Sequence, residues 1–139
     1  PVVGICTLDI LASRAQQGRV TVVLNAYQNQ FYLARYVVHD SIPELQGRIE
    51  IVDAETIADV LPQDELIYHD NGLEELLQDD RFTIQTGDVV LPKASALAVL
   101  ARHKFEADGA PPLHEILPMY LRVSSAEEKW DTHRKGKPA

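Results

Sequence analysis

The stretch that decides the fold is "RVTVVLNAYQNQFYLARYVVHD", Arg19–Asp40. Residues 19–27 are β-branched and apolar almost throughout, which is typical of a strand buried on both faces. The polar break at residues 28–30 suits a hairpin, with a second strand over residues 30–40. "GRIEIVD", residues 47–53, predicts a third strand after a turn at Ser41, Ile42 and Pro43. Three strands in succession predict an antiparallel arrangement.

Helices alternate with strands after residue 53. We predict helices over residues 54–62, 72–80 and 91–108, separated by strands over residues 65–70 and 81–86. This alternation implies parallel strands joined by right-handed crossovers. The longest helix has Pro92 near its start. Its apolar positions are Ala94, Leu97, Ala98, Leu100, Ala101 and Phe105.

The start of the chain predicts one more helix, with Thr7 as its N-cap and Gly18 as its stop. Three antiparallel strands followed by helix, strand, helix, strand and helix form the ribonuclease-H-like order. This α/β unit is duplicated in actin-like and hexokinase-like proteins. We therefore expect a mixed five-stranded sheet flanked by helices over residues 1–122, and a polar, partly flexible tail over residues 123–139.

Composition sets wide limits on function. A chain of 139 residues with 45% hydrophobic and 24% charged residues suits one soluble domain, or one lobe of a larger protein. A net charge of −8 opposes nonspecific binding to nucleic acid, although four basic residues lie in the last eleven positions.

A single cysteine, Cys6, excludes an internal disulfide and suits a reducing compartment. No apolar run is long enough to span a membrane, and no secretory signal is visible, so we expect a cytoplasmic protein. Because the chain starts without methionine inside an apolar pattern, we also expect that an amino-terminal segment precedes it.

The segment "PPLHEILPMYLR", residues 111–122, begins like the zinc-protease pattern H-E-x-x-H with His114 and Glu115. Its fifth position is Pro118 where the pattern needs a second histidine, and proline would break the helix that carries the site. A metalloprotease is therefore disfavoured. The five histidines are scattered, and none has metal-ligand spacing with Cys6 or the carboxylates, so surface or hydrogen-bonded roles are favoured. They are His39, His69, His103, His114 and His133.

Three other features allow a chemical and a structural interpretation. Cys6 near a helix start could have a lowered pKa, but no oriented base can be named for it, so an inert buried thiol is favoured. Asp70, Asn71 and Gly72 follow a strand where α/β folds place phosphates, yet a β–α turn with Asp70 or Asn71 as helix cap is the plainer interpretation. Lys93 lies near a helix N-terminus, where a solvated charge is the usual role.

The order of four motifs resembles the TsaB (YeaZ) family. They are "PVVGICTLDILA", "VLNAYQNQFYLARY", "GDVVLPKASALAVLA" and the closing "PMYLR". The match covers the chain but only the carboxy-terminal lobe of such a protein. The family's amino-terminal lobe, with its "D-T-S" strand and "G-P-G-S-F-T-G" loop, is absent from this sequence.

The resemblance implies a function without chemistry of its own. Proteins similar to TsaB are actin-like-fold relatives of the catalytic subunit TsaD, and they support it, with the ATPase TsaE, in making threonylcarbamoyladenosine (t6A) beside the tRNA anticodon. Older descriptions called the group glycoproteases. The resemblance implies no catalytic, cofactor or metal residues here, and partners that are TsaD-like and TsaE-like in the full-length protein. It gives the closing motif a structural role, with Tyr120 and Leu121 packing the chain's end and Arg122 pairing with a carboxylate or a partner.

Departures from the family pattern bear on the rival functions. The family's "D-A-R-x-G-E" becomes Asn25–Gln30, which loses the strand-end acid that a nucleotide–magnesium site wants. Only Gly72 remains of the later "G-x-G". Both losses favour a non-catalytic scaffold over an actin-like-fold ATPase or sugar-kinase lobe. A ribonuclease-H-like nuclease is also disfavoured, because the first strand offers no carboxylates for two metals.

Two further expectations concern the surface and partners of the chain. Removing the first lobe should leave exposed apolar faces on residues 5–12 and 94–105, and hence allow self-association as a homodimer. We expect no nucleotide to bind to the chain alone, no direct contact with nucleic acid and no membrane association.

Overall fold

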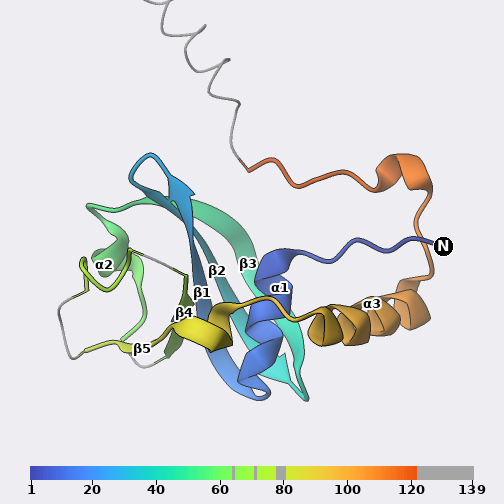
Figure 1. Ribbon diagram of the computed structural model, residues 1–139, viewed down its shortest axis with the longest axis horizontal. Helices are drawn as coiled ribbons and strands as arrows, with labels where there is room; N and C mark the ends of the chain where they lie inside the picture. The colour runs from blue at the N-terminus through green and yellow to red at the C-terminus, as the bar shows by residue number, and fades with distance from the viewer. Residues whose placement is uncertain (64, 71, 78–80, 122–139) are drawn as a thin grey trace, which may run out of the picture.

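The computed structural model describes residues 1–63, 65–70, 72–77 and 81–121. Its centre is one five-stranded sheet in the order β3-β2-β1-β4-β5 (Figure 1). β1 (Gly18–Tyr27), β2 (Gln30–His39) and β3 (Ile42–Asp53) pair antiparallel, whereas β4 (Leu66–His69) pairs parallel with β1 and β5 (Thr83–Gln85) pairs parallel with β4. The predicted mixed ribonuclease-H-like sheet is confirmed.

The β1–β2 hairpin is closed by a two-residue turn at Gln28 and Asn29, whose φ angles are 51° and 63°. Positive φ at both central residues is the mark of a type I′ turn, which matches the twist of the flanking strands. A bulge between Asn25 and Tyr27 leaves Ala26 as an extra residue on β1. The side-chain oxygen of Asn25 accepts a hydrogen bond from the Tyr27 amide at 2.7 Å, and so stabilises the bulged end of the strand.

The predicted turn before β3 was placed too late. The turn residues are Asp40 and Ser41, with φ angles of 50° and 64°, and β3 already begins at Ile42. Short polar side chains tolerate the left-handed conformation that such a turn requires. Pro43 lies inside β3 without breaking the sheet because β3 is an edge strand.

The helices between the later strands are shorter than predicted. α2 (Ile57–Val60) is a single turn, and residues 72–77 form hydrogen-bonded turns around the Leu73 carbonyl. The helix predicted over residues 72–80 is therefore wrong for its described part, and residues 78–80 lie outside the described ranges. A single turn suffices because Leu73 and Leu77 are both buried against the sheet. Packing, and not helix propensity, fixes this segment.

The two longer helices, α1 (Thr7–Ala12) and α3 (Ala94–Asp108), lie on the same side of the sheet, and the segment that leads into α3 crosses in front of α1 in Figure 1. The N-cap of α1 is Cys6 and not Thr7, and neither α1 nor α3 has a side-chain hydrogen bond at its cap. α1 continues as a 3-10 turn, Ser13–Ala15, and Gly18 opens β1. A second 3-10 turn, Gly87–Val90, precedes α3, and a third, Leu113–Glu115, follows it.

Apolar side chains form one core on each face of the sheet. The face toward α1 holds Leu11, Val22 and Tyr36, and the opposite face holds Leu33, Ile57 and Ile67, all at most 1% exposed. Because successive residues of a strand point to opposite faces, a strand buried on both sides is apolar at nearly every position. Residues 20–23 of β1 are all buried, as the sequence predicts, with valine at three positions and Thr21 as the polar exception.

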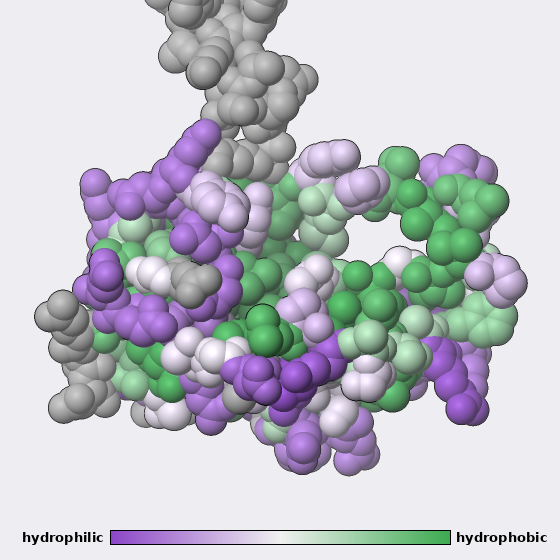
Figure 2. Space-filling view, in the orientation of Figure 1, coloured by the Kyte–Doolittle hydropathy of each residue, from purple (hydrophilic) through white to green (hydrophobic). Residues whose placement is uncertain are grey.

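α3 leaves three large apolar side chains exposed beside its charged residues. Among its fifteen residues Leu100 alone is buried, whereas Leu97, Val99 and Phe105 are 39%, 56% and 44% exposed. The prediction of an exposed apolar face is confirmed for α3 and wrong for α1, whose Leu8, Ile10, Leu11 and Ala12 are buried. In Figure 2 the hydrophobic surface gathers over α3 and over the segment that follows it. That segment exposes Leu113, Leu117, Met119 and Tyr120.

Candidate functional site

The carboxyl ends of β1 and β4 meet beside a cavity of about 350 Å³. The β1–β2 turn forms one wall, from Asn25 to Phe31, and Gly72, Glu75 and Leu76 form another. Ligands of open α/β sheets bind outside the carboxyl ends of the strands. This cavity, which we call the strand-end cavity, is therefore the first place to look for a site.

Asp70 binds the protein's own backbone at this edge. Its carboxylate Oδ1 accepts a hydrogen bond from the Asn25 amide at 2.9 Å, which ties the end of β4 to the end of β1. Gly72 has φ of +85°, and a Cβ on it would lie 3.7 Å from the Asn25 side-chain nitrogen. Glycine is needed here for its backbone conformation, since the space itself would admit a methyl group. Asn71, the other proposed cap, lies outside the described residues.

The walls of the strand-end cavity carry amides and one charge. Asn25, Gln28, Asn29 and Gln30 supply side-chain amides, and Glu75 supplies a carboxylate. A triphosphate needs cationic or backbone N–H donors and a carboxylate-held magnesium ion. No lysine, arginine or histidine lines this cavity in the described part of the chain. The arrangement suits a neutral polar group better than an anion.

His69 departs from the role that the sequence predicts for it. It is completely buried at the end of β4, and neither ring nitrogen has a hydrogen-bond partner within the described ranges. Nε2 lies 3.5 Å from Glu74 Oε1, a pair whose attraction depends on a protonated ring. Burial lowers the pKa of His69, while Glu74 and Asp70 raise it to a smaller extent. The ring is therefore held neutral around neutral pH.

Asp9 forms an interaction that sequence reasoning missed. The Tyr36 hydroxyl donates a hydrogen bond of 2.8 Å to Asp9 Oδ1, which joins α1 to the middle of β2. Burial raises the pKa of Asp9, and the hydrogen bond from Tyr36 and the charge of Lys104 oppose that rise. Burial and the Asp9 charge raise the pKa of Tyr36. An acid inside an apolar helix is the signal that could have revealed this pair, but its partner lies 27 positions away.

Cys6 is half-buried beside this pair. Burial raises the pKa of its thiol, and the Asp9 charge adds to the rise, although backbone amides of Leu8 and Asp9 oppose it. A raised pKa keeps the group a thiol at neutral pH, which is the opposite of an activated nucleophile. This environment supports the inert role that the sequence favours.

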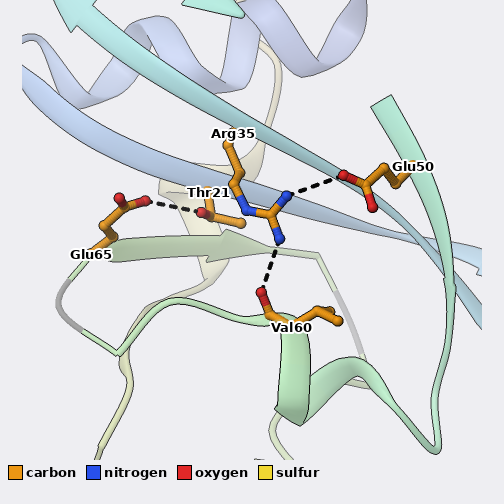
Figure 3. Close-up of polar contacts among 5 residues, drawn as sticks. All are labelled: Thr21, Arg35, Glu50, Val60 and Glu65. Carbon is orange, nitrogen blue, oxygen red and sulfur yellow. Dashed lines mark hydrogen bonds and ion pairs between the residues drawn. The ribbon is translucent and has the colours of Figure 1, made fainter. Parts of the chain in front are cut away.

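Arg35 links three elements on the other face of the sheet (Figure 3). Its guanidinium donates to Glu50 on β3 at 3.1 Å and to the Val60 carbonyl at the end of α2 at 2.9 Å. Nearby, the buried Thr21 hydroxyl donates to Glu65 at 3.3 Å. These contacts anchor the edge strand and α2 to the sheet, so their role is structural.

The remaining residues of interest do not converge on one place. His114 and Glu115 are exposed, with 3.8 Å between Nε2 and Oε1, and they lie in a 3-10 turn and not in a helix. Tyr120 is 84% exposed, so its predicted packing role is wrong within this chain. Lys93 lies 3.7 Å from Asp88 at the surface. Arg122, His133 and the predicted tail lie outside the described residues.

The described residues form neither a metal-binding cluster nor a membrane-spanning helix. No group of three or more His, Cys, Asp or Glu side chains there could hold a metal ion. Within the same ranges, none of the helices has both the length and the apolar character needed to cross a lipid bilayer.

The fold is an α/β lobe with a mixed five-stranded sheet, and two solved structures share it. No protein-family model and no curated protein sequence matches the chain. Two structures from Pseudomonas aeruginosa are similar to it: one titled an uncharacterized protein with similarity to peptidase YeaZ, and one titled YeaZ. Their TM-scores are 0.68 and 0.69, each is 23% identical in sequence, and the matches cover 88% and 87% of this chain. The chain therefore has the fold of YeaZ, and it spans 59% of the length of each of those chains.

Proposed function

We propose that the chain is the carboxy-terminal lobe of a TsaB-like protein and acts as a non-catalytic scaffold in t6A modification of tRNA. The fold of YeaZ supports this assignment, together with four TsaB-like motifs in the family's order. The observation that carries the scaffold role is the strand-end cavity, where Asn25 replaces an acid and Asp70 is bound to backbone. The partners we propose are a TsaD-like catalytic subunit and a TsaE-like ATPase, in the cytoplasm.

The exposed face of α3 supplies a surface for assembly. A run of apolar side chains on a long helix is unfavourable in water unless another surface covers it. In a two-lobed TsaB-like protein the other lobe lies next to this one, so we propose that it covers α3. In the isolated chain, a second copy would cover the same face and form a homodimer.

The scaffold role is tested by reconstitution of t6A synthesis on tRNA with TsaD-like and TsaE-like partners. We expect t6A to form when the full-length protein is added, and to fall to background when it is left out. Equal t6A yield with and without the protein would reject the scaffold role. The full-length protein is the right reagent because this chain spans only part of its structural relatives.

A nucleotide-binding lobe is the alternative function, and an ATP titration separates the two. We expect ATP with magnesium to produce no saturable shift in the amide signals of Asn25 and Gly72, because the strand-end cavity lacks cationic donors. A micromolar site there that is lost in Gly72→Val would restore the ATPase or sugar-kinase alternative.

A further inference from the structure

A second cavity, of about 320 Å³, lies on the helical side of the sheet. Its walls come from three separate segments: the 3-10 turn after α1 supplies Ser13 and Arg14, the β2–β3 turn supplies Ser41, and the first turn of α3 supplies Ser95 and Ala96. None of these residues belongs to the strand-end cavity. A ligand here therefore does not depend on the strand-end cavity, although the exposed Val99 of α3 also lines this second cavity.

Arg14 brings an unpaired positive charge to this cavity. Its Nε is buried and has no hydrogen-bond partner, although the residue as a whole is only partly buried, and no ion pair joins Arg14 to another described residue. Arg19 and Arg35, by contrast, lie 3.6 Å and 3.1 Å from Glu65 and Glu50. A buried guanidinium N–H without an acceptor costs free energy, since it loses water and gains nothing in exchange. A cavity that holds such a group is suited to an anion.

The start of α3 directs further donors to the same place. The first amide bonded within the helix is that of Leu97, which donates to the Lys93 carbonyl at 3.0 Å. The amides of Ser95 and Ala96 therefore have no partner inside the helix, and no side chain caps them. α3 has fifteen residues, so its aligned peptide dipoles place partial positive charge at this end. The Ser95 hydroxyl adds a further donor.

We propose that this cavity binds a phosphate group, held by the Arg14 guanidinium on one side and by the Ser95 and Ala96 amides on the other. The donors approach from different segments, which suits a tetrahedral anion with oxygens in several directions better than a planar carboxylate. Ser41 lines the third side. The cavity is larger than one phosphate, so the group bound is either inorganic phosphate or the phosphate of a small phosphomonoester.

Two features of the chain limit the affinity. The net charge of −8 repels an anion at long range, although screening confines this effect to about 8 Å at physiological salt. Ser95 is exposed, so water competes for its hydroxyl. We therefore expect binding in the low-millimolar range for inorganic phosphate.

The test is a titration of the isotope-labelled chain followed by NMR, with chloride at matched ionic strength as the reference. Sodium phosphate should shift the amide signals of Ser95 and Ala96 and the side-chain Nε–H signal of Arg14, and the shifts should saturate. Ribose 5-phosphate forms the second arm. Several-fold tighter binding of the sugar phosphate identifies a phosphomonoester as ligand, and equal or weaker binding identifies the inorganic anion.

Variants decide whether Arg14 carries the binding. Arg14→Gln should weaken phosphate binding at least tenfold, whereas the matched control Arg19→Gln should leave it unchanged. If Arg14→Gln fails to fold, Ser95→Asp replaces it, because a carboxylate in the first turn is compatible with the helix and competes with the ligand. Shifts that never saturate, equal shifts with chloride, or an equal loss in Arg19→Gln would overturn the proposal. If the phosphates of ATP reach this cavity, they should shift the amide signal of Ser95 and not that of Gly72. The two signals therefore distinguish binding here from binding in the strand-end cavity.

Discussion

The two α-helices on the same side of the sheet differ in how they use their apolar residues. α1 has six residues and buries four of them, whereas α3 has fifteen and buries Leu100 alone. The short helix is stabilised by the core it covers, since six residues could not hold a helix by propensity. The long helix has length and alanine-rich propensity to sustain it, and it leaves its apolar surface for another molecule. Length is thus a poor guide to which helix belongs to the core.

Truncating one leucine on each helix should give the largest difference in stability between α1 and α3. Leu11 on α1 is 1% exposed, so Leu11→Ala should lower the free energy of unfolding by about 2–5 kcal/mol through lost burial and a residual cavity. Leu97→Ala on α3 is the matched control and should cost less than about 1 kcal/mol, because Leu97 is already 39% exposed. Urea unfolding monitored by circular dichroism measures both. Equal losses at the two positions would show that α3 is as much part of the core as α1.

The pH dependence of stability should differ between a buried histidine, His69, and an exposed histidine on α3, His103. Burial lowers the pKa of His69, so the unfolded chain binds a proton at higher pH than the folded chain does. The stabilising contribution of the neutral ring is therefore present above the ordinary pKa of 6.5 and declines as pH falls below it, by at most about 1.4 kcal/mol per pH unit for one proton.

His69→Leu should remove this dependence on pH in urea unfolding between neutral and mildly acidic conditions. Glu74 and Asp70 also act on the ring, and both remain in His69→Leu, so the difference in slope from wild type just below pH 6.5 reports the histidine. The exposed His103→Gln on α3 is the control and should retain the wild-type slope. An unchanged slope in His69→Leu would contradict the neutral, buried ring.

Loss of an arginine contact should also lower stability more in the sheet than on α3, although by less than core truncation does. Arg35→Gln loses hydrogen bonds to Glu50 and to the Val60 carbonyl, and should lower stability by about 1 kcal/mol because the guanidinium is only partly exposed. Arg102→Gln on α3 loses a 2.7 Å contact with Glu106 that is fully solvated, and should leave the unfolding midpoint unchanged. Thermal unfolding of the two variants side by side provides the test. A larger loss for Arg102→Gln would contradict the assignment of α3 as an outer helix.

The sheet could be predicted from sequence because its pattern is local. Three of residues 20–23 are valine, and the polar break at Gln28 and Asn29 closes the hairpin, so the succession of strands could be predicted from the sequence. The errors occurred where a distant contact decides the structure. The sequence pattern around Leu73 and Leu77 predicts a helix, but burial of these two side chains is achieved with a single turn. Pro43 is tolerated inside β3 because β3 is an edge strand of the sheet.

The candidate sites were harder to predict than the sheet. The tie between Asp70 and the Asn25 amide, the Asp9–Tyr36 pair and the cavity beside Arg14 each join residues that are far apart in sequence. A charge in an apolar segment can mark one member of such a pair, but spacing along the chain does not identify its partner. The resemblance of motifs identified the fold, but the roles of Asp70, Asp9 and Arg14 depend on three-dimensional neighbours.

The central claim is that the outer face of α3 is a contact surface, and sedimentation equilibrium of the isolated chain tests it most directly. We predict that the wild-type chain associates as its concentration rises, and that the double variant Leu97→Asp and Phe105→Asp stays monomeric with an unchanged unfolding midpoint. Glu106→Gln, on the same helix, is a control that should associate like wild type. A wild-type chain that is strictly monomeric up to the highest soluble concentration would contradict the claim.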